Sequence, residues 1–292
     1  MSLRVATRGS ELARWQARRV ADRLGIPTEL VIVSTTGDER ADVPLHEMGG
    51  TGVFVKEVQA AVLDGRADLA VHSAKDLPAV TVDGLDLASV PERADPHDAL
   101  VGAALDEIPS GGRIGSDSVR RRAQLAAFRP DLGFGSLRGN IATRLEKAAG
   151  FDAVVVALAA LDRLGLSGRV AEVLDPHVVL PQVGQGALAV ECRTGDATVR
   201  AALEAIDDPD AHRAVVAERA FLESLGGGCD LPCAALARVD GEEIVIEVLL
   251  ASLDGRIVLR AGARGRDARA LGIEAARRLL DEAGGRLLLE DA

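Results

Sequence analysis

Basic side chains gather at two predicted helix starts in the middle of the chain. Residues 115–118 open one helix and residues 139–140 open another. The arginines in or beside these starts are Arg120, Arg121, Arg122, Arg138 and Arg144. Free backbone N–H groups and the helix dipole favour anions at such starts, and guanidinium groups bind carboxylates through paired hydrogen bonds. The pattern indicates a carboxylate site, with a solvated arginine face as the alternative, and a third helix start at residues 8–10 could add another anion contact.

A second polar group follows a predicted buried strand over residues 68–72. It ends in Lys75 and Asp76, at the position from which an α/β sheet presents side chains to a cleft. An ionised Asp76 next to Lys75 could stabilise a developing cation or move a proton. Alternatively, Asp76 caps a turn before Pro78, and spacing alone does not choose between the two. His72 is interpreted as a core histidine with no catalytic role.

Cys229 lies in a glycine-rich loop over residues 225–232. Glycines let the backbone approach a bulky group and leave the thiol accessible, which suits a nucleophilic or covalently substituted cysteine. The alternative is an inert thiol, as expected for Cys192 in its apolar surroundings. Cys229 and Cys233 are four residues apart, which weakens a redox interpretation. The three cysteines fit neither a secreted disulfide framework nor a zinc site, so no metal is expected.

Alternating strands and helices must position these residues. The elements predicted before residue 160 are strand 3–6, helix 10–24, strand 31–33, helix 53–63, strand 68–72, helices 115–128 and 139–149, and strand 153–158. Such alternation predicts mainly parallel sheets in α/β domains, and prolines at 91, 96 and 109 suggest a boundary between them. The elements predicted at the end are helix 210–225, antiparallel strands 234–239, 243–250 and 256–260, and helix 267–283. They form a small α+β module.

Composition narrows the class of protein. The 292 residues include 34 Lys+Arg and 45 Asp+Glu, a formal net charge of −11, which argues against nucleic acid or an anionic membrane as partner. One tryptophan, five phenylalanines and no tyrosine leave few stacking surfaces for single-stranded nucleic acid. The apolar run 153–161 is far too short to span a membrane. We expect a cytoplasmic protein.

Six motifs in order carry a family resemblance that covers almost the whole chain. They are Ala6-Thr7-Arg8-Gly9-Ser10, Phe54-Val55-Lys56-Glu57, Ala70 to Pro78, Ser136-Leu137-Arg138-Gly139-Asn140, Leu180 to Ala187 and Gly227-Gly228-Cys229. Together they resemble the porphobilinogen deaminase (hydroxymethylbilane synthase) family. The resemblance implies two periplasmic-binding-protein-like α/β domains with crossover segments and a small C-terminal α+β domain. The corresponding ranges are 1–93 plus 187–207, 94–186 and 208–292.

The resemblance also implies the activity, that of a transferase in tetrapyrrole and heme biosynthesis. Four porphobilinogen units are joined head to tail on a dipyrromethane cofactor, with loss of ammonia each time, and hydrolysis releases hydroxymethylbilane. The cofactor is attached to Cys229 by a thioether, and Asp76 is the catalytic carboxylate. The implied cofactor-binding residues are Arg8, Ser10, Ser73, Lys75, Ser116, Ser118, Arg120, Arg121, Arg138 and Arg144. The implied substrate-binding residues are Arg8, Lys56, Arg138, Arg144 and Arg163.

The chemistry of this substrate agrees with the composition. Porphobilinogen carries an acetate and a propionate, so an arginine-lined cleft must balance the growing chain inside an acidic protein. Loss of ammonia leaves an azafulvene-like cation, which a carboxylate such as Asp76 can stabilise through the pyrrole N–H. Porphobilinogen is the expected partner of a monomer that binds neither nucleic acid nor membrane. Glycines in residues 42–55 predict a mobile lid over the cleft.

Three positions depart from the family pattern, and two other classes of function compete with it. Asp117 adds a negative charge to the presumed anion site, Gly226 replaces a common acidic residue, and Cys233 replaces a usual aliphatic residue. A two-lobed binding protein without catalysis would share the first two domains, and a thiol redox protein would use the cysteines. The mass of a covalent dipyrromethane distinguishes all three classes.

Overall fold

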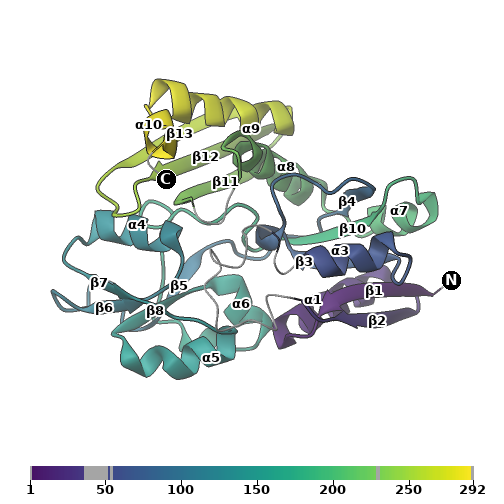
Figure 1. The fold of residues 1–292 in the computed structure, drawn as a ribbon, viewed down its shortest axis with the longest axis horizontal. Helices are drawn as coiled ribbons and strands as arrows, with labels where there is room; N and C mark the ends of the chain where they lie inside the picture. Colours follow the sequence, from purple (N-terminus) through teal and green to yellow (C-terminus); the bar gives the residue numbers. More distant parts are fainter. Residues whose placement is uncertain (1, 36–51, 53–54, 228–230, 291–292) are drawn as a thin grey trace.

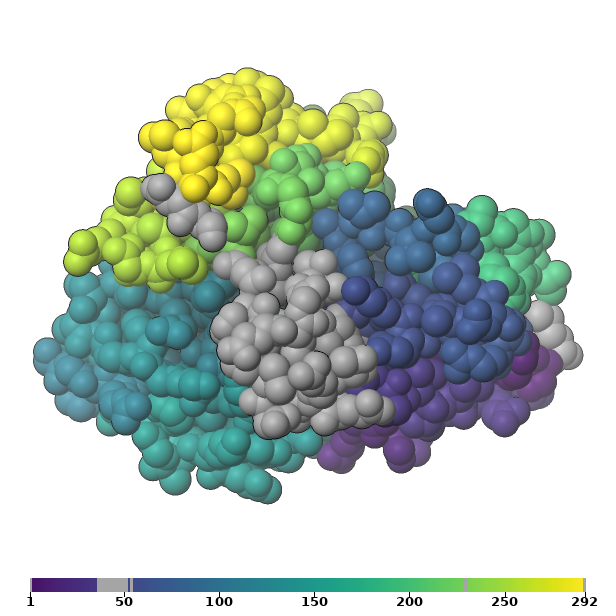
Figure 2. All heavy atoms as spheres, in the orientation of Figure 1, coloured from purple at the N-terminus to yellow at the C-terminus, as the bar shows by residue number. Residues whose placement is uncertain are grey.

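Three separate β-sheets organise the chain in the computed structural model, which describes residues 2–35, 52, 55–227 and 231–290 (Figure 1). We call each sheet with its helices a lobe. The first two lobes lie side by side, and the third lies across both of them, as the yellow-green part of the space-filling view shows (Figure 2). The exact domain boundaries stay a prediction.

The first lobe contains a five-stranded mixed sheet with the order β2-β1-β3-β10-β4. Its strands are β1 (Leu3–Arg8), β2 (Thr28–Val33), β3 (Leu69–Ser73), β4 (Leu85–Ser89) and β10 (Leu188–Arg193). Its helices are α1 (Glu11–Leu24), α3 (Lys56–Leu63) and α7 (Ala197–Glu204). Strands β1, β2 and β3 run parallel, whereas β10 is antiparallel to β3 and β4. Buried aliphatic side chains such as Leu3, Val20 and Leu69 form the core between α1 and the sheet.

The second lobe repeats this plan with the strand order β7-β6-β8-β5-β9. Its strands are β5 (Asp98–Gly102), β6 (Arg113–Gly115), β7 (Gly133–Gly135), β8 (Ala153–Ala157) and β9 (Glu172–Val173). Its helical elements are α4 (Val119–Phe128), α5 (Ile141–Glu146), the 3-10 turns Lys147–Gly150 and Ser167–Arg169, and α6 (Leu158–Arg163). Helices α4 and α5 each follow a parallel strand, β6 or β7, after a short connection, so their N-termini share one edge of the sheet.

The third lobe is an antiparallel sheet packed against helices. Its elements are α8 (Pro209–Ser224), β11 (Cys233–Asp240), β12 (Glu243–Ala251), β13 (Val258–Gly265), α9 (Ala268–Arg277) with a π-helical turn at Arg278–Glu282, and α10 (Arg286–Glu290). Helices α8 and α9 cross closely at Gly272, where a Cβ would lie 2.2 Å from the Ala217 carbonyl oxygen. The fully buried Phe221 lies at the centre of the core.

Glu218 of α8 joins the third lobe to both chain crossings between the other two lobes. Its side chain is completely buried and accepts hydrogen bonds from Arg93 Nη1 at 2.6 Å and Nη2 at 3.1 Å. The backbone N–H groups of Gly184 and Ala237 donate to the same carboxylate at 2.6 and 2.8 Å. Arg93 lies between β4 and β5, and Gly184 lies between β9 and β10. One carboxylate therefore fixes both crossings to the third lobe.

The structure confirms the fold class and corrects two details. As predicted, most strands of the first two sheets run in one direction, and a single strand in each, β10 in the first lobe and β5 in the second, runs opposite to the other four. The predicted helix 139–149 is a short α-helix followed by a 3-10 turn. The last strand covers 258–265 rather than 256–260, because the N–H groups of Arg256 and Ile257 donate to Asp254 and Ser252 in the preceding turn.

We predict that Glu218→Gln lowers the free energy of unfolding by about 3 kcal/mol, because it leaves Arg93 as a partly buried cation without its carboxylate. Urea denaturation measures the change. Glu223→Gln is the matched control on the same helix, since Glu223 pairs with the exposed Arg269 at 2.9 Å, and that surface pair contributes less than about 1 kcal/mol. Equal losses in the two variants would contradict the role of Glu218 as the junction of the lobes.

Candidate active site

The turn that carries Asp76 follows directly from strand β3. Residues Ala74–Asp76 form a single 3-10 turn, and the Ala74 N–H donates to the Ala187 carbonyl oxygen at 3.0 Å. Leu77 then returns to an extended backbone, as is usual before a proline. Lys75 and Asp76 are half-buried at the end of the strand. The turn predicted from the sequence is therefore present, at the edge where a ligand would meet the sheet.

Glycines bring two other segments against this turn. A Cβ at Gly184 would lie 2.9 Å from the Ala74 carbonyl carbon, so no larger residue fits there at φ +71°. A Cβ at Gly227 would lie 3.0 Å from the Ala79 Cβ atom. Gly227 precedes Cys229 by two residues, and Cys229 itself lies outside the described residues. Gly227 thus lies against the chain that follows the Asp76 turn.

Arg120 and Arg121 bind an internal carboxylate that we did not single out from the sequence. Asp98 is fully buried and lies 2.7 Å from Arg120 Nη2 and 2.6 Å from Arg121 Nη2. Both arginines also donate to carbonyl oxygens, Arg120 to Leu180 at 2.6 Å and Arg121 to Val155 at 3.0 Å. Although burial opposes it, the two guanidinium groups hold the pKa of Asp98 well below its usual range.

Lys75 extends the cluster toward the first lobe. Its Nζ donates to Gln185 Oε1 at 3.3 Å, and Gln185 Nε2 donates to Asp98 Oδ1 at 2.9 Å. Burial, reinforced by the cations Arg121 and Arg120 against Asp76 and Asp98, lowers the pKa of Lys75 to about 8. The carboxylates Asp76 and Asp98 thus do not fully compensate for the burial of Lys75 and for the repulsion from the two arginines.

Arg138 and Arg144 approach the same region from the start of α5. Arg144 Nε donates to the Gly139 carbonyl oxygen at 2.9 Å. Burial lowers the pKa of Arg144, the cations Arg121 and Arg138 add to this, and the carboxylates Asp117 and Asp76 oppose it. Arg144 therefore lies in one electrostatic field with the Asp76 turn and with α4.

Most of the other predicted site residues lie at helix starts and strand ends. The hydroxyl oxygens of Ser10 and Ser118 cap α1 and α4, and Ser116 accepts the Ser118 N–H at 3.3 Å. Arg8 and Ser73 end neighbouring parallel strands β1 and β3 and are half-buried. Lys56 is exposed at the first position of α3. The hydroxyl groups of Ser10, Ser116 and Ser118 can still donate to a ligand while they accept from the backbone.

Arg163 belongs to a different part of the cleft between the lobes. Its Nη2 donates to the Gly186 carbonyl oxygen at 2.6 Å, and its guanidinium lies 5.9 Å from the centre of the Trp15 ring. Burial lowers its pKa to about 10, with Asp162 as the opposing charge. A cavity of about 300 Å³ lies between α1 and α6 and is lined by both side chains. Arg163 is thus outside the electrostatic group that surrounds Asp76.

His72, in the strand just before the turn, serves the fold. His72 is buried, and its Nε2 lies 3.2 Å from Glu191 Oε2, as expected for a core histidine. Glu191 also accepts from Gln59 Nε2 at 2.9 Å.

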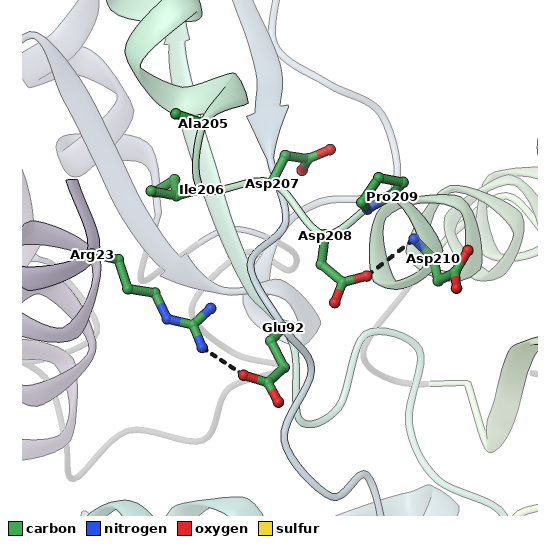
Figure 3. Close-up of a pocket in the computed structure, with 8 residues that line it drawn as sticks. All are labelled: Arg23, Glu92, Ala205, Ile206, Asp207, Asp208, Pro209 and Asp210. Carbon is green, nitrogen blue, oxygen red and sulfur yellow. Dashed lines mark hydrogen bonds and ion pairs between the residues drawn. The ribbon is translucent and has the colours of Figure 1, made fainter.

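A second cavity, of about 470 Å³, is lined by Glu92, which pairs with Arg23 at 2.6 Å, and by Asp207, Asp208 and Asp210 (Figure 3). Its negative charge does not suit a carboxylate ligand.

Comparison with protein-family models agrees with this geometry. The model described as "Porphobilinogen deaminase, dipyromethane cofactor binding domain" matches residues 3–201, and "Porphobilinogen deaminase, C-terminal domain" matches residues 212–281. The chain belongs to the porphobilinogen deaminase family. The first match contains Asp76 and the whole arginine cluster, and the second contains Cys229.

Curated porphobilinogen deaminases match along the full length. The protein of Syntrophus aciditrophicus is 45% identical over 99% of this chain and 98% of its own, and that of Roseiflexus castenholzii is 46% identical with the same coverage. Among solved structures, an arginine-specific periplasmic binding protein of Salmonella typhimurium gives a TM-score of 0.40 at 10% identity, covering 73% of this chain and 96% of its own. Within the described residues, no helix is both long and apolar enough to cross a membrane.

The cluster suits the dipyrromethane cofactor of the porphobilinogen deaminase family. Its cations are Lys75, Arg120, Arg121, Arg138 and Arg144, and its carboxylates are Asp76, Asp98 and Asp117. The cations exceed the carboxylates, which leaves positive charge for an anionic ligand. Arg120 Nε is buried and has no hydrogen-bond partner among the described residues. No group of three or more metal-ligating side chains occurs in the described part of the chain.

We predict that cofactor loading weakens above pH 8 because Lys75 loses its charge. A ligand carboxylate on Nζ raises the pKa of Lys75 from about 8, so binding takes up a proton above that pH and affinity falls by up to about tenfold per pH unit. The measurement is the rate of loading of cofactor-free protein with porphobilinogen from pH 7 to 9.5. Lys75→Arg, which keeps its charge, should remove most of the decline, and an identical decline in both proteins would contradict the assignment.

Proposed function

We propose that the chain acts as a porphobilinogen deaminase, joining four porphobilinogen units head to tail with loss of ammonia and releasing hydroxymethylbilane by hydrolysis. The observation that carries the proposal is the position of Asp76. It lies on a turn at the edge of the first sheet, within a cluster of cations contributed by both lobes. A substrate that bears two carboxylates and develops positive charge during reaction requires both features.

Asp76 is the proposed catalytic carboxylate. Departure of ammonia from porphobilinogen leaves positive charge on the pyrrole, and a carboxylate that accepts the pyrrole N–H stabilises that charge. The surrounding cations hold the substrate carboxylates, so the ligand satisfies them while Asp76 interacts with the reacting ring. Arg8, Ser10, Ser73, Lys75, Ser116, Ser118, Arg120, Arg121, Arg138 and Arg144 are the proposed cofactor contacts, and Arg8, Lys56, Arg138, Arg144 and Arg163 the proposed substrate contacts.

The cofactor is proposed to be dipyrromethane joined by a thioether to Cys229. When bound, it supplies the primer to which the first substrate unit is joined. The contact between Gly227 and Ala79 supports this assignment, because Gly227 stands two residues before Cys229 in the sequence and Ala79 three residues after Asp76. Cys192 is completely buried and Cys233 nearly so, which leaves little room for attachment at either.

Arg120 and Arg121, which bind Asp98, have a different role in this proposal from Arg138 and Arg144. Arg120 and Arg121 are oriented by Asp98 and by carbonyl oxygens, so they contribute positive potential from fixed positions. Arg138 and Arg144 are less enclosed, and we propose that they make the more direct carboxylate contacts.

Porphobilinogen is the proposed partner, and a monomeric state and a cytoplasmic location stay predictions. The predicted lid over residues 42–55 lies almost wholly outside the described residues.

Intact-mass analysis of freshly purified protein tests the activity class. We expect the mass of the chain plus one dipyrromethane, and peptide mapping should place it on the peptide that contains Cys229. An unmodified protein that consumes no porphobilinogen would instead support a carboxylate-binding protein without catalysis. Modification of Cys192 or Cys233 would contradict the attachment site alone.

Asp76→Asn tests the catalytic role directly. We expect turnover of the cofactor-loaded variant to fall at least about 100-fold, because the charge acts on the reaction path, while the melting temperature changes by only a few degrees. The exposed Asp83→Asn, seven residues further on, is the control. If Asp76→Asn kept near-normal turnover, or lost activity only together with its fold, Asp76 would be a structural turn residue.

A further inference from the structure

Asp117 brings a carboxylate of the chain itself into the arginine cluster. Its Oδ2 lies 3.3 Å from Arg138 Nε, and its Oδ1 accepts the Leu137 N–H at 3.3 Å. It also acts electrostatically on Arg144, where it opposes the lowering of the pKa. Asp117 lies just before α4, and Arg138 and Arg144 lie just before and within α5. One carboxylate therefore faces both arginines proposed to contact ligand carboxylates.

The setting of Asp117 differs from that of Asp98. Asp98 is completely buried and its closest arginine contact is 2.6 Å, so a ligand cannot displace it without exposing buried charges. The side chains of Asp117 and Arg138 keep 27% and 29% of their surface exposed, and their contact is longer. Ion pairs of this partly solvated kind contribute little free energy and exchange partners readily. An incoming carboxylate can replace Asp117 at Arg138.

We propose that Asp117 sets the affinity of the site for its anionic ligands by competing with them for Arg138 and Arg144. The proposal rests on the function proposed above. Each added porphobilinogen unit brings two more carboxylates, so an arginine cluster without internal competition would bind the growing chain and the product ever more tightly. Asp117 lowers the affinity of the site at Arg138 and Arg144, which helps the product to leave.

Asp117→Asn removes the charge and keeps a side-chain oxygen for the Leu137 N–H. The probe is an unreactive pyrrole that carries an acetate and a propionate and lacks the aminomethyl group. Titration calorimetry with cofactor-loaded protein should show about fivefold tighter binding to Asp117→Asn than to wild type, together with a lower KM for porphobilinogen. The difference should shrink at about 0.5 M salt, where charges on partly exposed groups are screened. Asp117→Glu, which keeps the charge, should stay within about twofold of wild type.

Asp131→Asn is the matched control in the same lobe. Asp131 pairs with Arg129 at 2.8 Å, and 32% of its side-chain surface is exposed. The control should bind the probe as wild type does. Unchanged or weaker binding by Asp117→Asn would overturn the proposal, and Asp117 would then be only a structural contact between two loops. An equal gain in affinity in Asp131→Asn would also overturn it, because the gain would then come from the change in net charge alone. A wild-type protein that binds the probe but turns over no porphobilinogen would overturn the proposed function instead.

Discussion

The ion pairs that Asp98 forms with Arg120 and Arg121 are the interaction on which the site depends. Without that carboxylate, two neighbouring guanidinium groups would face each other and Lys75 in a largely dehydrated space, and both their repulsion and their desolvation would oppose folding. Asp98 is the first residue of β5, so the arginines of α4 are held against the sheet of the second lobe. Gln185 then connects the same carboxylate to Lys75 in the first lobe. Positive charge can accumulate around Asp76 because one negative charge is buried among the cations.

Much of the candidate site could be predicted from the sequence, because its residues stand in short motifs at strand ends and helix starts. The Asp76 turn and the starts of α4 and α5 lie where the pattern of strands, glycines and capping residues indicates. The pairing of Asp98 could not be predicted in this way. Asp98 is 22 residues from Arg120, and nothing in the spacing shows that β5 runs beside β8 and under α4. The sequence therefore identifies the cations and does not show which of them are already paired.

The same limit applies to the fold. The direction of a strand such as β10 depends on where the chain re-enters the sheet, not on its own composition. Glu218 is a further case, since a glutamate in the middle of a helix usually lies on the solvated face. Here it is completely buried, because residues 93, 184 and 237 from three different segments donate to it. Contacts of this range arise from tertiary structure and leave no periodic signal.

The contact between Trp15 and Arg163 makes tryptophan fluorescence a reporter of the spacing between the first two lobes. Trp15 is the only tryptophan of the chain and lies on α1, whereas Arg163 ends α6 in the other lobe. The indole is 37% exposed, so any change in lobe spacing alters both its contact with a cation and its access to water. Its emission should respond to the distance between the lobes without any added label. Opening of the cleft can thus be followed in the unmodified protein on the time scale of the reaction.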